Sequence, residues 1–325
     1  MEKVMIGVDI GGTAVKIGFI TESGDIITKW EIPTNTANNG LSIVEDVWTS
    51  IEDELGQQNI LRENLIGMGV GAPGFIDGES GFVYEAVNIG WKGMPLAERF
   101  KKISQLPVFA ANDANVAALG ENWLGAGQQA KNLLAVTLGT GVGGGVIVGG
   151  QIVSGESGTA GEIGHITVDT EGAACNCGRI GCLETITSAT GIVRQAMKQI
   201  KNHPNSDLAA YYQQAGDITA KDIFERAKLG DALCQQIVEH TADILGFVIA
   251  NVATVINPSK ILIGGGVSKA GADFIEQIDH NFNKYALGRI RSICQVTAAQ
   301  LGNDAGMIGA AFLVKQHLQN DAIGI

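Results

Sequence analysis

The sequence is poor in basic residues and has no long hydrophobic run. It contains 22 lysines and arginines against 34 aspartates and glutamates, a formal net charge of -12 in 325 residues. So acidic a chain would repel a phosphate backbone, which disfavours nucleic acid as a partner. Its longest apolar run, at about 244–256, is shorter than the ~20 residues that cross a bilayer. Because no basic, apolar and cleavable leader follows Met1, we expect a cytoplasmic protein without a membrane span.

Proline is also scarce, with 6 residues against 45 glycines. Glycine lets two backbones approach closely and adopts turn conformations that other residues avoid, so this ratio indicates many tight backbone contacts. No linker rich in proline or serine divides the chain. Its length nevertheless predicts about two domains, at ~150 residues each, and we expect them to meet at a hinge.

Two distant segments share one pattern. Residues 4–27 read as three short strands whose first turn is rich in glycine, and residues 133–153 repeat this pattern. A shift of 128 positions superposes the two segments and places Phe19 over Ile147. Such internal similarity predicts two related halves, each beginning with the same antiparallel meander.

Segments with helical spacing follow these strands. Apolar side chains recur every fourth position from Ile43 to Leu55, and a long apolar helix is predicted over 233–255, ending before Pro258. A strand follows at 261–263, and a terminal helix at 306–318. Alternating strands and helices predict an α/β fold.

The first glycine turn has the sequence Asp9-Ile10-Gly11-Gly12-Thr13. Glycine amides can approach an anion, and the Thr13 hydroxyl adds a donor, so the turn suits a phosphate. Asp9 would repel that phosphate directly, and its natural role is to hold the hydrated Mg²⁺ that accompanies ATP. The alternative is an ordinary hairpin turn with a solvated aspartate. Neither the P-loop motif nor the glycine-rich motifs of protein kinases are present.

Two further glycine turns occur in the second half. The segment 138–145, which includes Thr140 and Gly141, matches the first turn in position, so the pair could clamp a polyphosphate from opposite sides. Gly264-Gly265-Gly266 ends the strand at 261–263 and would let the backbone lie against a flat base such as adenine. The alternatives are a glycine-rich hairpin and a simple turn from strand to helix.

Three of the five cysteines lie close together, and a histidine precedes them. His165, Cys175, Cys177 and Cys182 could supply one imidazole and three thiolates. These four ligands form a closed tetrahedral zinc site without a position for water, which predicts a structural metal. The alternative is a set of unrelated free thiols, but buried apolar cysteines would not gather among glycine, asparagine and arginine.

The motifs D-I-G-G-T, L-G-T-G-V-G and I-G-G-G occur in the order found in the actin, Hsp70 and hexokinase superfamily. With G-E-I-G-H and C-N-C-G-R-I-G-C-L-E, the chain more narrowly resembles the ROK family of bacterial sugar kinases, and specifically its glucokinases, over about residues 4–313. The resemblance implies two ribonuclease H-like α/β domains around a central cleft, with a structural zinc loop. It also implies ATP-dependent phosphorylation of glucose to glucose 6-phosphate.

A sugar kinase needs a carboxylate that accepts the proton of the attacking hydroxyl. From the residues alone, Asp113 could be this base or the N-cap of the following helix. The resemblance aligns Asn112 and Asp113 with the family's catalytic pair and favours the base. It further implies that the sugar is bound by residues of several loops: Gly71, Asn88, Asn112, Glu162, His165 and Glu184. For Glu162 and Glu184 the alternative is a solvated carboxylate, and His165 would bind zinc through one ring nitrogen and sugar through the other.

The expected domains are residues 1–116 with 303–325, and residues 117–302. Glucose, ATP with Mg²⁺, structural Zn²⁺ and further copies of the chain, as a dimer or tetramer, are the expected partners. Family members that phosphorylate N-acetylmannosamine, N-acetylglucosamine or fructose share every motif above, and a catalytically silent sugar sensor is the alternative of another class. Position 14, often basic in such turns, is Ala14, and Lys16 receives no catalytic role. No helix-turn-helix precedes residue 4, so DNA binding is not expected.

Overall fold

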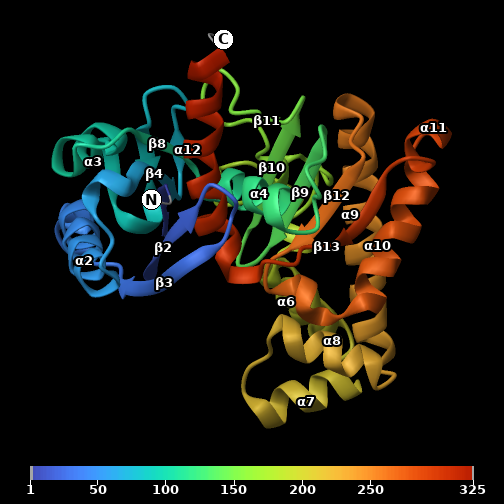
Figure 1. Cartoon of the computed structure of the whole chain (residues 1–325). Coiled ribbons are helices and arrows are strands. Elements are labelled where there is room, and N and C mark those ends of the chain that lie inside the picture. The colour runs from blue at the N-terminus through green and yellow to red at the C-terminus, as the bar shows by residue number, and fades with distance from the viewer. Residues whose placement is uncertain (1–2, 324–325) are drawn as a thin grey trace.

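The computed structural model describes residues 3–323 and consists of two halves, each built on a five-stranded sheet (Figure 1). The first sheet has the order β3-β2-β1-β4-β8, in which β1 is antiparallel to β2 and parallel to β4. Its strands are β1 (Val4–Ile10), β2 (Ala14–Thr21), β3 (Ile26–Pro33), β4 (Leu65–Ala72) and β8 (Val108–Asn112).

The second sheet repeats this arrangement. Its order is β11-β10-β9-β12-β13, with β9 antiparallel to β10 and parallel to β12. Its strands are β9 (Leu133–Leu138), β10 (Val142–Val148), β11 (Gln151–Ile152), β12 (Lys260–Gly264) and β13 (Gln295–Ala298). The shared order and directions confirm the duplicated α/β fold that the sequence predicts.

The superposition of Phe19 on Ile147 is wrong by one residue. Phe19 pairs with Ile6, whose counterpart at a shift of 128 is Leu134, and Leu134 pairs with Val146. The reason is turn length: four residues separate the last strand pair in the first hairpin, from Ile10 to Val15, whereas three separate Leu138 from Val142. A constant shift cannot represent this deletion, so only the first strands of the two halves align.

Helices and a small sheet cover and connect the two five-stranded sheets. The three-stranded sheet consists of β5 (Phe75–Ile76), β6 (Phe82–Ala86) and β7 (Trp91–Pro95). The helices are α1 (Ala37–Gly40), α2 (Ile43–Gln58), α3 (Leu96–Ser104), α4 (Asp113–Leu124), α5 (Glu184–Thr187), α6 (Ala189–Asn202), α7 (Asp207–Ala215), α8 (Ala220–Lys228), α9 (Ala232–Ile256), α10 (Ala272–Tyr285), α11 (Gly288–Arg291) and α12 (Ala305–Ile323). The predicted apolar stripe from Ile43 to Leu55 is the buried face of α2.

The last helix, α12, returns from the second half to the first sheet, as Figure 1 shows. Glycine makes this packing possible: a Cβ atom at Gly69 of β4 would lie 1.7 Å from the Ala310 carbonyl oxygen, and one at Gly309 would lie 1.6 Å from that of Val116 in α4. Backbone therefore touches backbone on both sides of α12. The abundance of glycine is explained in part by this three-layer stack of sheet, α12 and α4.

The helix α4 packs against both halves. One apolar cluster joins α4 to the second sheet and to α12; it includes Val116, Leu119, Leu133, Ile147, Ala310 and Leu313. Each half also has its own larger core. The two halves are thus held together through the pair of helices α4 and α12.

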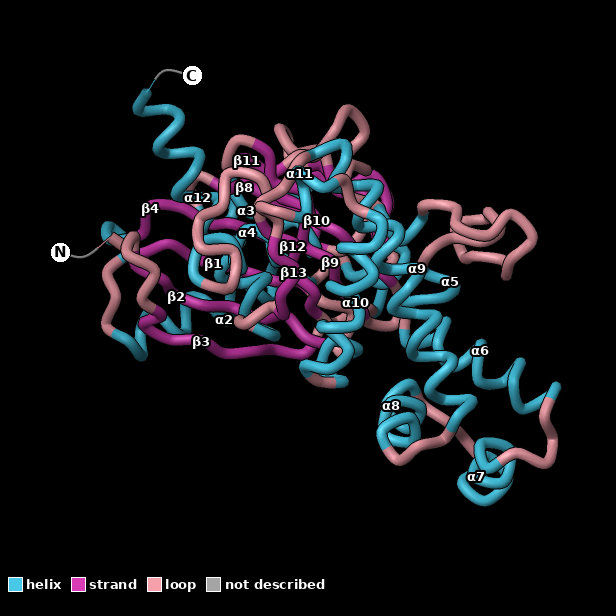
Figure 2. Tube along the Cα trace, turned by 90° about the vertical axis from the view of Figure 1, so that its right-hand side faces the viewer, coloured by secondary structure: helices cyan, strands magenta, loops and turns pink. Residues whose placement is uncertain are grey.

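Among residues 3–323, α9 alone is long and apolar enough to cross a membrane by length and composition. Asn257 takes a left-handed conformation after it, and Pro258 follows, so the helix ends where the sequence predicts. Of its most apolar 18-residue window, 56% is buried within the protein, where α9 packs against α8 and α10. This burial identifies a core helix of the second half (Figure 2).

Candidate functional site

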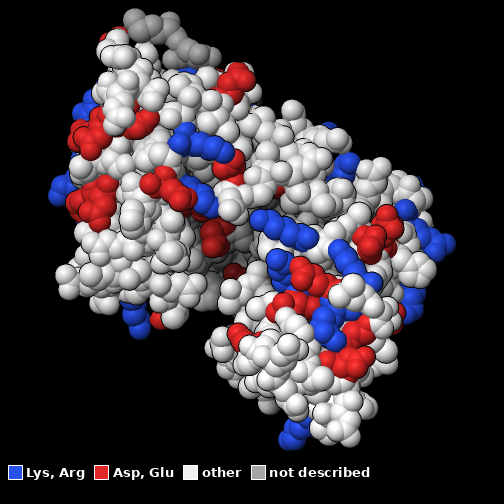
Figure 3. Space-filling view, turned by 90° about the horizontal axis from the view of Figure 1, so that it is seen from below, with Lys and Arg blue, Asp and Glu red and all other residues white. Residues whose placement is uncertain are grey.

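A cavity of about 500 Å³, the central cavity, lies between the two glycine turns. Figure 3 shows the molecule hollowed between its two halves, with acidic side chains in the hollow. The predicted residues that line the cavity are Asp9, Gly11, Asp113, Gly141, Glu162, His165, Glu184 and Gly265. The fold thus brings residues from six separate loops and helix ends to one place.

The N-cap alternative for Asp113 is excluded by its neighbour. Asn112 is the N-cap of α4: its Oδ1 accepts from the backbone amides of Ala114 and Asn115, at 2.9 and 3.4 Å. Its Nδ2 donates to the Gly74 carbonyl at 3.0 Å. Asp113 is the first residue of the helix and faces the central cavity. Because Asn112 performs the capping, the Asp113 carboxylate is available for chemistry.

Two carboxylates in the cavity have raised pKa values. The pKa of Asp9 is raised from 3.8 to about 6: burial is the largest cause, the nearby Asp113 also raises the pKa, and Lys16 lowers it. Burial also raises the pKa of Asp113, although the Ala114 amide, which donates to Oδ1 at 2.8 Å, acts in the opposite direction. Asp113 is exposed toward the cavity, yet protein surrounds it on the other sides. A carboxylate with a raised pKa accepts a proton more readily.

Glu162 and Glu184 have different environments. Burial raises the pKa of Glu162, while His165 lowers it. Glu184 instead reaches the second glycine turn: its Oε2 accepts from the Val142 amide at 3.0 Å, and its Oε1 lies 3.7 Å from the Cys175 thiol. Glu184 therefore connects the cysteine cluster to the turn, in addition to lining the cavity.

The remaining predicted residues lie around the cavity. Gly71 pairs with Asp9 across the sheet, and a Cβ atom there would lie 2.4 Å from Val116 Cγ2 and 3.5 Å from the Asp9 carboxylate. Gly71 therefore leaves room for the Val116 side chain of α4. Asn88 is exposed, and a Cβ atom at Gly12 would lie 3.9 Å from its own Cβ, so Asn88 adjoins the first turn.

The glycine turns are closed by their own backbones. The Gly11 amide donates to the Ala14 carbonyl at 3.0 Å, which leaves the amides of Gly12 and Thr13 to face an anion. Gly265, with a φ of 86°, packs against the end of β9, where a Cβ atom would lie 2.4 Å from the Leu138 carbonyl. The Gly264–Gly266 turn thus lies directly beside the second glycine turn.

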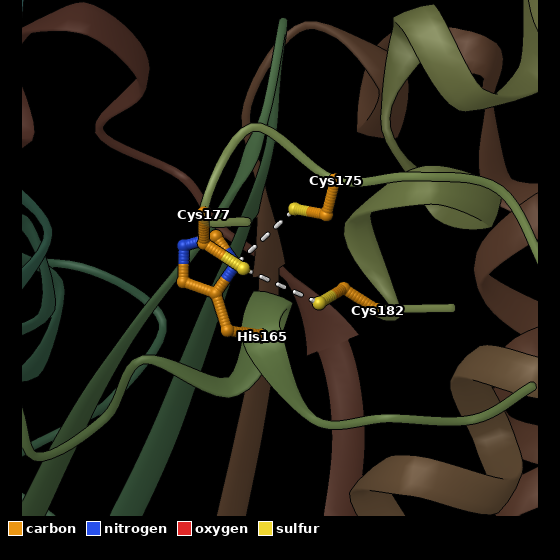
Figure 4. A group of neighbouring side chains, drawn as sticks. All are labelled: His165, Cys175, Cys177 and Cys182. Carbon is orange, nitrogen blue, oxygen red and sulfur yellow. Dashed lines mark hydrogen bonds between the residues drawn. The ribbon is translucent and has the colours of Figure 1, made fainter. Parts of the chain in front are cut away.

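The predicted metal ligands form one cluster (Figure 4). Four ligand atoms, one each from His165, Cys175, Cys177 and Cys182, lie within 4.8 Å of one another. The Cys175 Sγ is 3.6 Å from His165 Nδ1, and the Cys177 and Cys182 sulfurs are 3.6 Å apart. Tetrahedral zinc with Zn–S bonds of about 2.3 Å separates its ligands by similar distances, so the cluster fits zinc. His165 also lines the central cavity, where its other ring nitrogen can meet a ligand.

A model of the ROK family matches residues 5–317. The chain belongs to the ROK family. The family resemblance seen in the motifs is thereby confirmed. A protein named glucokinase from Halalkalibacterium halodurans is 51% identical over 312 residues, which are 96% of this chain and 94% of that protein. Another, from Thermotoga maritima, is 35% identical over 97% of this chain and 98% of its own length.

A solved structure gives the same result. The ROK glucokinase from Streptomyces griseus, determined in complex with glucose and AMPPNP, matches with a TM-score of 0.77 and 35% identity. The match covers 96% of this chain and 99% of the other. Both sequence and structure therefore place the whole chain in the ROK sugar-kinase fold.

Sequence reasoning missed one wall of the ROK site. A second cavity, of about 730 Å³, adjoins the second and third glycine turns at Thr140 and Gly266. Lys221, Phe224 and Lys228 of α8 line it. Their spacing of three and four positions places them on one face of a helix, and this spacing is visible in the sequence. No glycine motif marks the segment, so the motifs did not predict this part of the site.

From the sequence, Lys16 received no catalytic role. In the central cavity, Lys16 is the one lysine or arginine among the lining residues, which include four carboxylates. Its Nζ donates to the Asn303 carbonyl at 3.2 Å. Lys16 lies opposite Asp9 in the β1–β2 pairing, so both side chains leave the same face of the sheet.

Proposed function

We propose that this ROK protein is a glucokinase, which transfers the γ-phosphate of ATP to glucose and forms glucose 6-phosphate. The observation that carries the proposal is the position of Asp113, exposed in the cavity between two glycine turns while Asn112 caps the helix. The identity with glucokinases over nearly the whole chain supports glucose as the sugar. The ligands in the Streptomyces griseus structure support a sugar and a nucleotide in one cleft.

Asp113 acts as the general base. The 6-hydroxyl of glucose passes its proton to the Asp113 carboxylate while its oxygen attacks the γ-phosphorus in line, and ADP leaves. The raised pKa of Asp113 suits this task, because a base with a pKa nearer to the working pH takes the proton more effectively.

The nucleotide lies across the two glycine turns. The amides of Gly12 and Thr13 face its phosphates from the first half, and those of Thr140 and Gly141 from the second. Its base lies against the Gly264–Gly266 turn and enters the second cavity at Gly266, where Phe224 offers an aromatic face. Lys16 neutralises part of the phosphate charge that the four carboxylates would otherwise repel.

Asp9 would hold the hydrated Mg²⁺ of the nucleotide. Its carboxylate is buried and its pKa is raised, so the ionised form lacks a compensating charge that a divalent cation would provide. When bound, Mg²⁺ neutralises phosphate oxygens. The residues present therefore fit the metal, and Gly306 leaves the space around Asp9 open.

The sugar lies on the opposite side of Asp113. Glu162, Glu184 and His165 line the cavity together with Asp113, and Asn88, Asn112 and Gly71 would add contacts from the first half. Zinc bound by His165, Cys175, Cys177 and Cys182 is structural: it fixes the His165 ring and the loop that ends at Glu184. A site with several buried polar groups can reject a sugar that lacks one matching hydroxyl by ~10⁴-fold.

The two domains are residues 1–116 with 303–325, and residues 117–302. Their division passes through α4, which packs against both sheets. Closure of the cleft over a sugar would exclude water from the phosphoryl group and complete the approach of Asp113. We place this enzyme in the cytoplasm, and we include neither nucleic acid nor membrane among its partners.

A panel of sugars in an ADP-release assay tests the function. Glucose should give the highest kcat/KM, above N-acetylmannosamine, N-acetylglucosamine and fructose. Preference for an acetylated sugar would keep the kinase but replace its substrate. Sugar binding without ADP release, with any sugar, would instead identify a sugar sensor and overturn the proposal.

A further inference from the structure

A buried carboxylate in α4 takes no part in the proposed proton transfer or metal binding. Glu121 lies about two turns along α4 from Asp113 and is 3% exposed. Among the ion pairs of residues 3–323, none includes Glu121. A buried carboxylate opposes folding unless a counter-charge or hydrogen bonds compensate for the lost water. Hydrogen bonds must therefore stabilise Glu121.

Four hydrogen bonds from backbone amides supply this compensation. The Gln300 amide donates to Oε1 at 2.8 Å and to Oε2 at 3.0 Å, and the Leu301 amide donates to Oε1 at 2.6 Å. The Ala126 amide donates to Oε2 at 3.1 Å. A Cβ atom at Gly125 would lie 2.2 Å from Oε2, so the turn after α4 leaves room for the carboxylate. Glu121 thus binds amides that are 179 and 180 positions away along the chain.

The distant amides belong to the β13–α12 segment, residues 299–304, where the chain leaves the second sheet and enters α12 (Figure 1). Three of its six residues are exposed and none is buried. Segments with few buried contacts open readily unless hydrogen bonds hold them. Because Glu121 accepts from two consecutive amides of this segment, it anchors the segment to α4.

The β13–α12 segment also forms part of the central cavity and contacts Lys16. Gly302 and Asn303 line the central cavity, and both also line a third cavity, of about 330 Å³, together with Glu121. The Asn303 carbonyl accepts a hydrogen bond from Lys16 Nζ at 3.2 Å. The one lysine among the residues that line the central cavity is therefore held by a segment that Glu121 anchors.

We propose that Glu121 is a positioning residue for the nucleotide. Its carboxylate fixes the β13–α12 segment, and the Asn303 carbonyl of that segment keeps the Lys16 ammonium group beside the phosphates. This role rests on the proposed function, in which Lys16 neutralises part of the phosphate charge. The charge of a lysine sits on a long, flexible side chain, so a fixed acceptor is needed to keep it in one place.

The location of the segment predicts an effect on the nucleotide and none on the sugar. The proposed sugar-binding residues Glu162, His165 and Glu184 lie in or beside the cysteine loop, and Glu184 anchors that loop to the Val142 amide of the second hairpin. This anchor does not depend on Glu121. Release of the β13–α12 segment should therefore weaken nucleotide binding selectively.

Titration with AMPPNP, a nucleotide whose terminal phosphate is not readily transferred, tests the positioning role without catalysis. Glu121→Gln should raise the Kd for AMPPNP by about tenfold, the effect of one weakened contact to a charged group. The amide keeps the shape of the side chain, but its nitrogen is a donor and would face the donors of Ala126 and Gln300. In steady-state kinetics the KM for ATP should rise likewise, while the KM for glucose stays unchanged.

A double-mutant cycle tests whether the effect passes through Lys16. Lys16→Met should raise the Kd for AMPPNP by a similar factor, and Glu121→Gln should add little in the Lys16→Met background. Hydrogen exchange of residues 299–304 should be faster in Glu121→Gln than in the wild type. If Glu121→Gln does not fold, Glu121→Asp takes its place: it keeps the charge but is one methylene too short to reach both segments.

Asp231→Asn is the matched control. The Asp231 side chain is 7% exposed and likewise accepts from two backbone amides, those of Leu233 and Cys234. It lines neither the central cavity nor the second cavity, so its variant should lose thermal stability and bind AMPPNP as the wild type does.

Three results would contradict the positioning role alone: a Glu121→Gln variant that loses only stability, effects of Glu121→Gln and Lys16→Met that add, or unchanged hydrogen exchange of residues 299–304. A wild-type chain that does not bind AMPPNP would instead overturn the proposed function, and the positioning role with it.

Discussion

The two halves have the same sheet but obtain their functional carboxylates differently. In the first half, Asp9 lies on the strand that leads into the glycine turn, and burial raises its pKa to about 6. The corresponding residue of the second half is Thr137. In the second half the carboxylate comes from a segment outside the repeated strands. Glu184, at the end of the cysteine loop, accepts a hydrogen bond from the Val142 amide in the second hairpin.

The same contrast holds at the helices that follow the last strands. After β8 the chain enters α4 directly, so that Asp113 is placed in the cavity at the first position of the helix. After β13 a loop precedes α12, and Gly306 near the start of that helix leaves room for Asp9. The helix after the first sheet therefore carries the proposed base, Asp113, whereas the helix after the second sheet carries a glycine that leaves room for Asp9. The two halves share their sheet order, and the functional residues lie where the two halves differ.

The largest loss of activity should come from Asp113→Asn, which removes the carboxylate that distinguishes the start of α4 from the start of α12. Loss of the general base should reduce kcat by ~10²–10⁴-fold while glucose still binds. The ADP-release rate and a separate sugar-binding titration measure these two quantities. Asp207→Asn is the matched control, because Asp207 is likewise the first residue of a helix whose N-cap is the preceding residue, but lies in exposed α7. Near-wild-type turnover of Asp113→Asn would contradict its assignment as the base.

Removal of the metal from the cysteine loop should weaken sugar binding by residues of the second half. Cys182→Ser should abolish bound zinc, about one ion per chain in the wild type. It should raise the KM for glucose more than that for ATP, because His165 and Glu184 lose their support. Metal analysis and steady-state kinetics measure the change. Cys234→Ala, a buried cysteine outside the cluster, should retain zinc, and fully active protein without zinc would contradict a structural role.

Asp9→Asn should stabilise the nucleotide-free protein at neutral pH. The folded pKa, about 6, lies above 3.8, so ionised Asp9 opposes folding at higher pH. The variant should therefore be more stable than the wild type at pH 7, by up to about 3 kcal/mol at 1.36 kcal/mol per pKa unit. The difference should shrink as pH falls through 6 and vanish below about 4. Denaturant unfolding at several pH values measures it, and a difference independent of pH would contradict the raised pKa.

Glu184→Gln should have the smallest effect, since the amide oxygen can still accept from Val142. The loss of a charged acceptor should cost about 1 kcal/mol of stability. We expect the KM for glucose to rise and kcat to change little. Thermal unfolding and glucose kinetics measure both. A fall in kcat as large as that of Asp113→Asn would show that Glu184 shares the base function.

Local features of the sequence were predictable because their cause is local. The glycine turns, the end of α9 before Pro258, and the cysteine and histidine spacing are set by neighbouring residues, and the structure contains each of them. The duplicated sheet order also followed from the repeat. The family resemblance then connected Asp113 with the proposed chemistry, which spacing alone left open.

The features that the sequence did not predict depend on the packing of distant segments. The first hairpin turn is one residue longer than the second, and a superposition at one constant shift does not reveal this difference. Asn112 also donates through Nδ2 to the Gly74 carbonyl, 38 positions away, a contact that no local pattern records. Lys221, Phe224 and Lys228 approach the glycine turns through the folding of α8 against them, and no motif records this approach.

The crossing of α4 and α12 has a mechanical consequence. A Cβ atom at Gly120 would lie 2.1 Å from the Ala305 carbonyl and 2.9 Å from the Gly309 amide, so no side chains interdigitate at this crossing. Ordinary helix pairs interlock through ridges and grooves, which resist rotation. Here backbone bears on backbone at Gly120 and at Gly309, and side chains pack only to either side, as where Trp123 of α4 stacks on Phe312 of α12 at 4.9 Å between ring centroids. A side chain added at either glycine would force the two helices apart, and with them the two halves that they join.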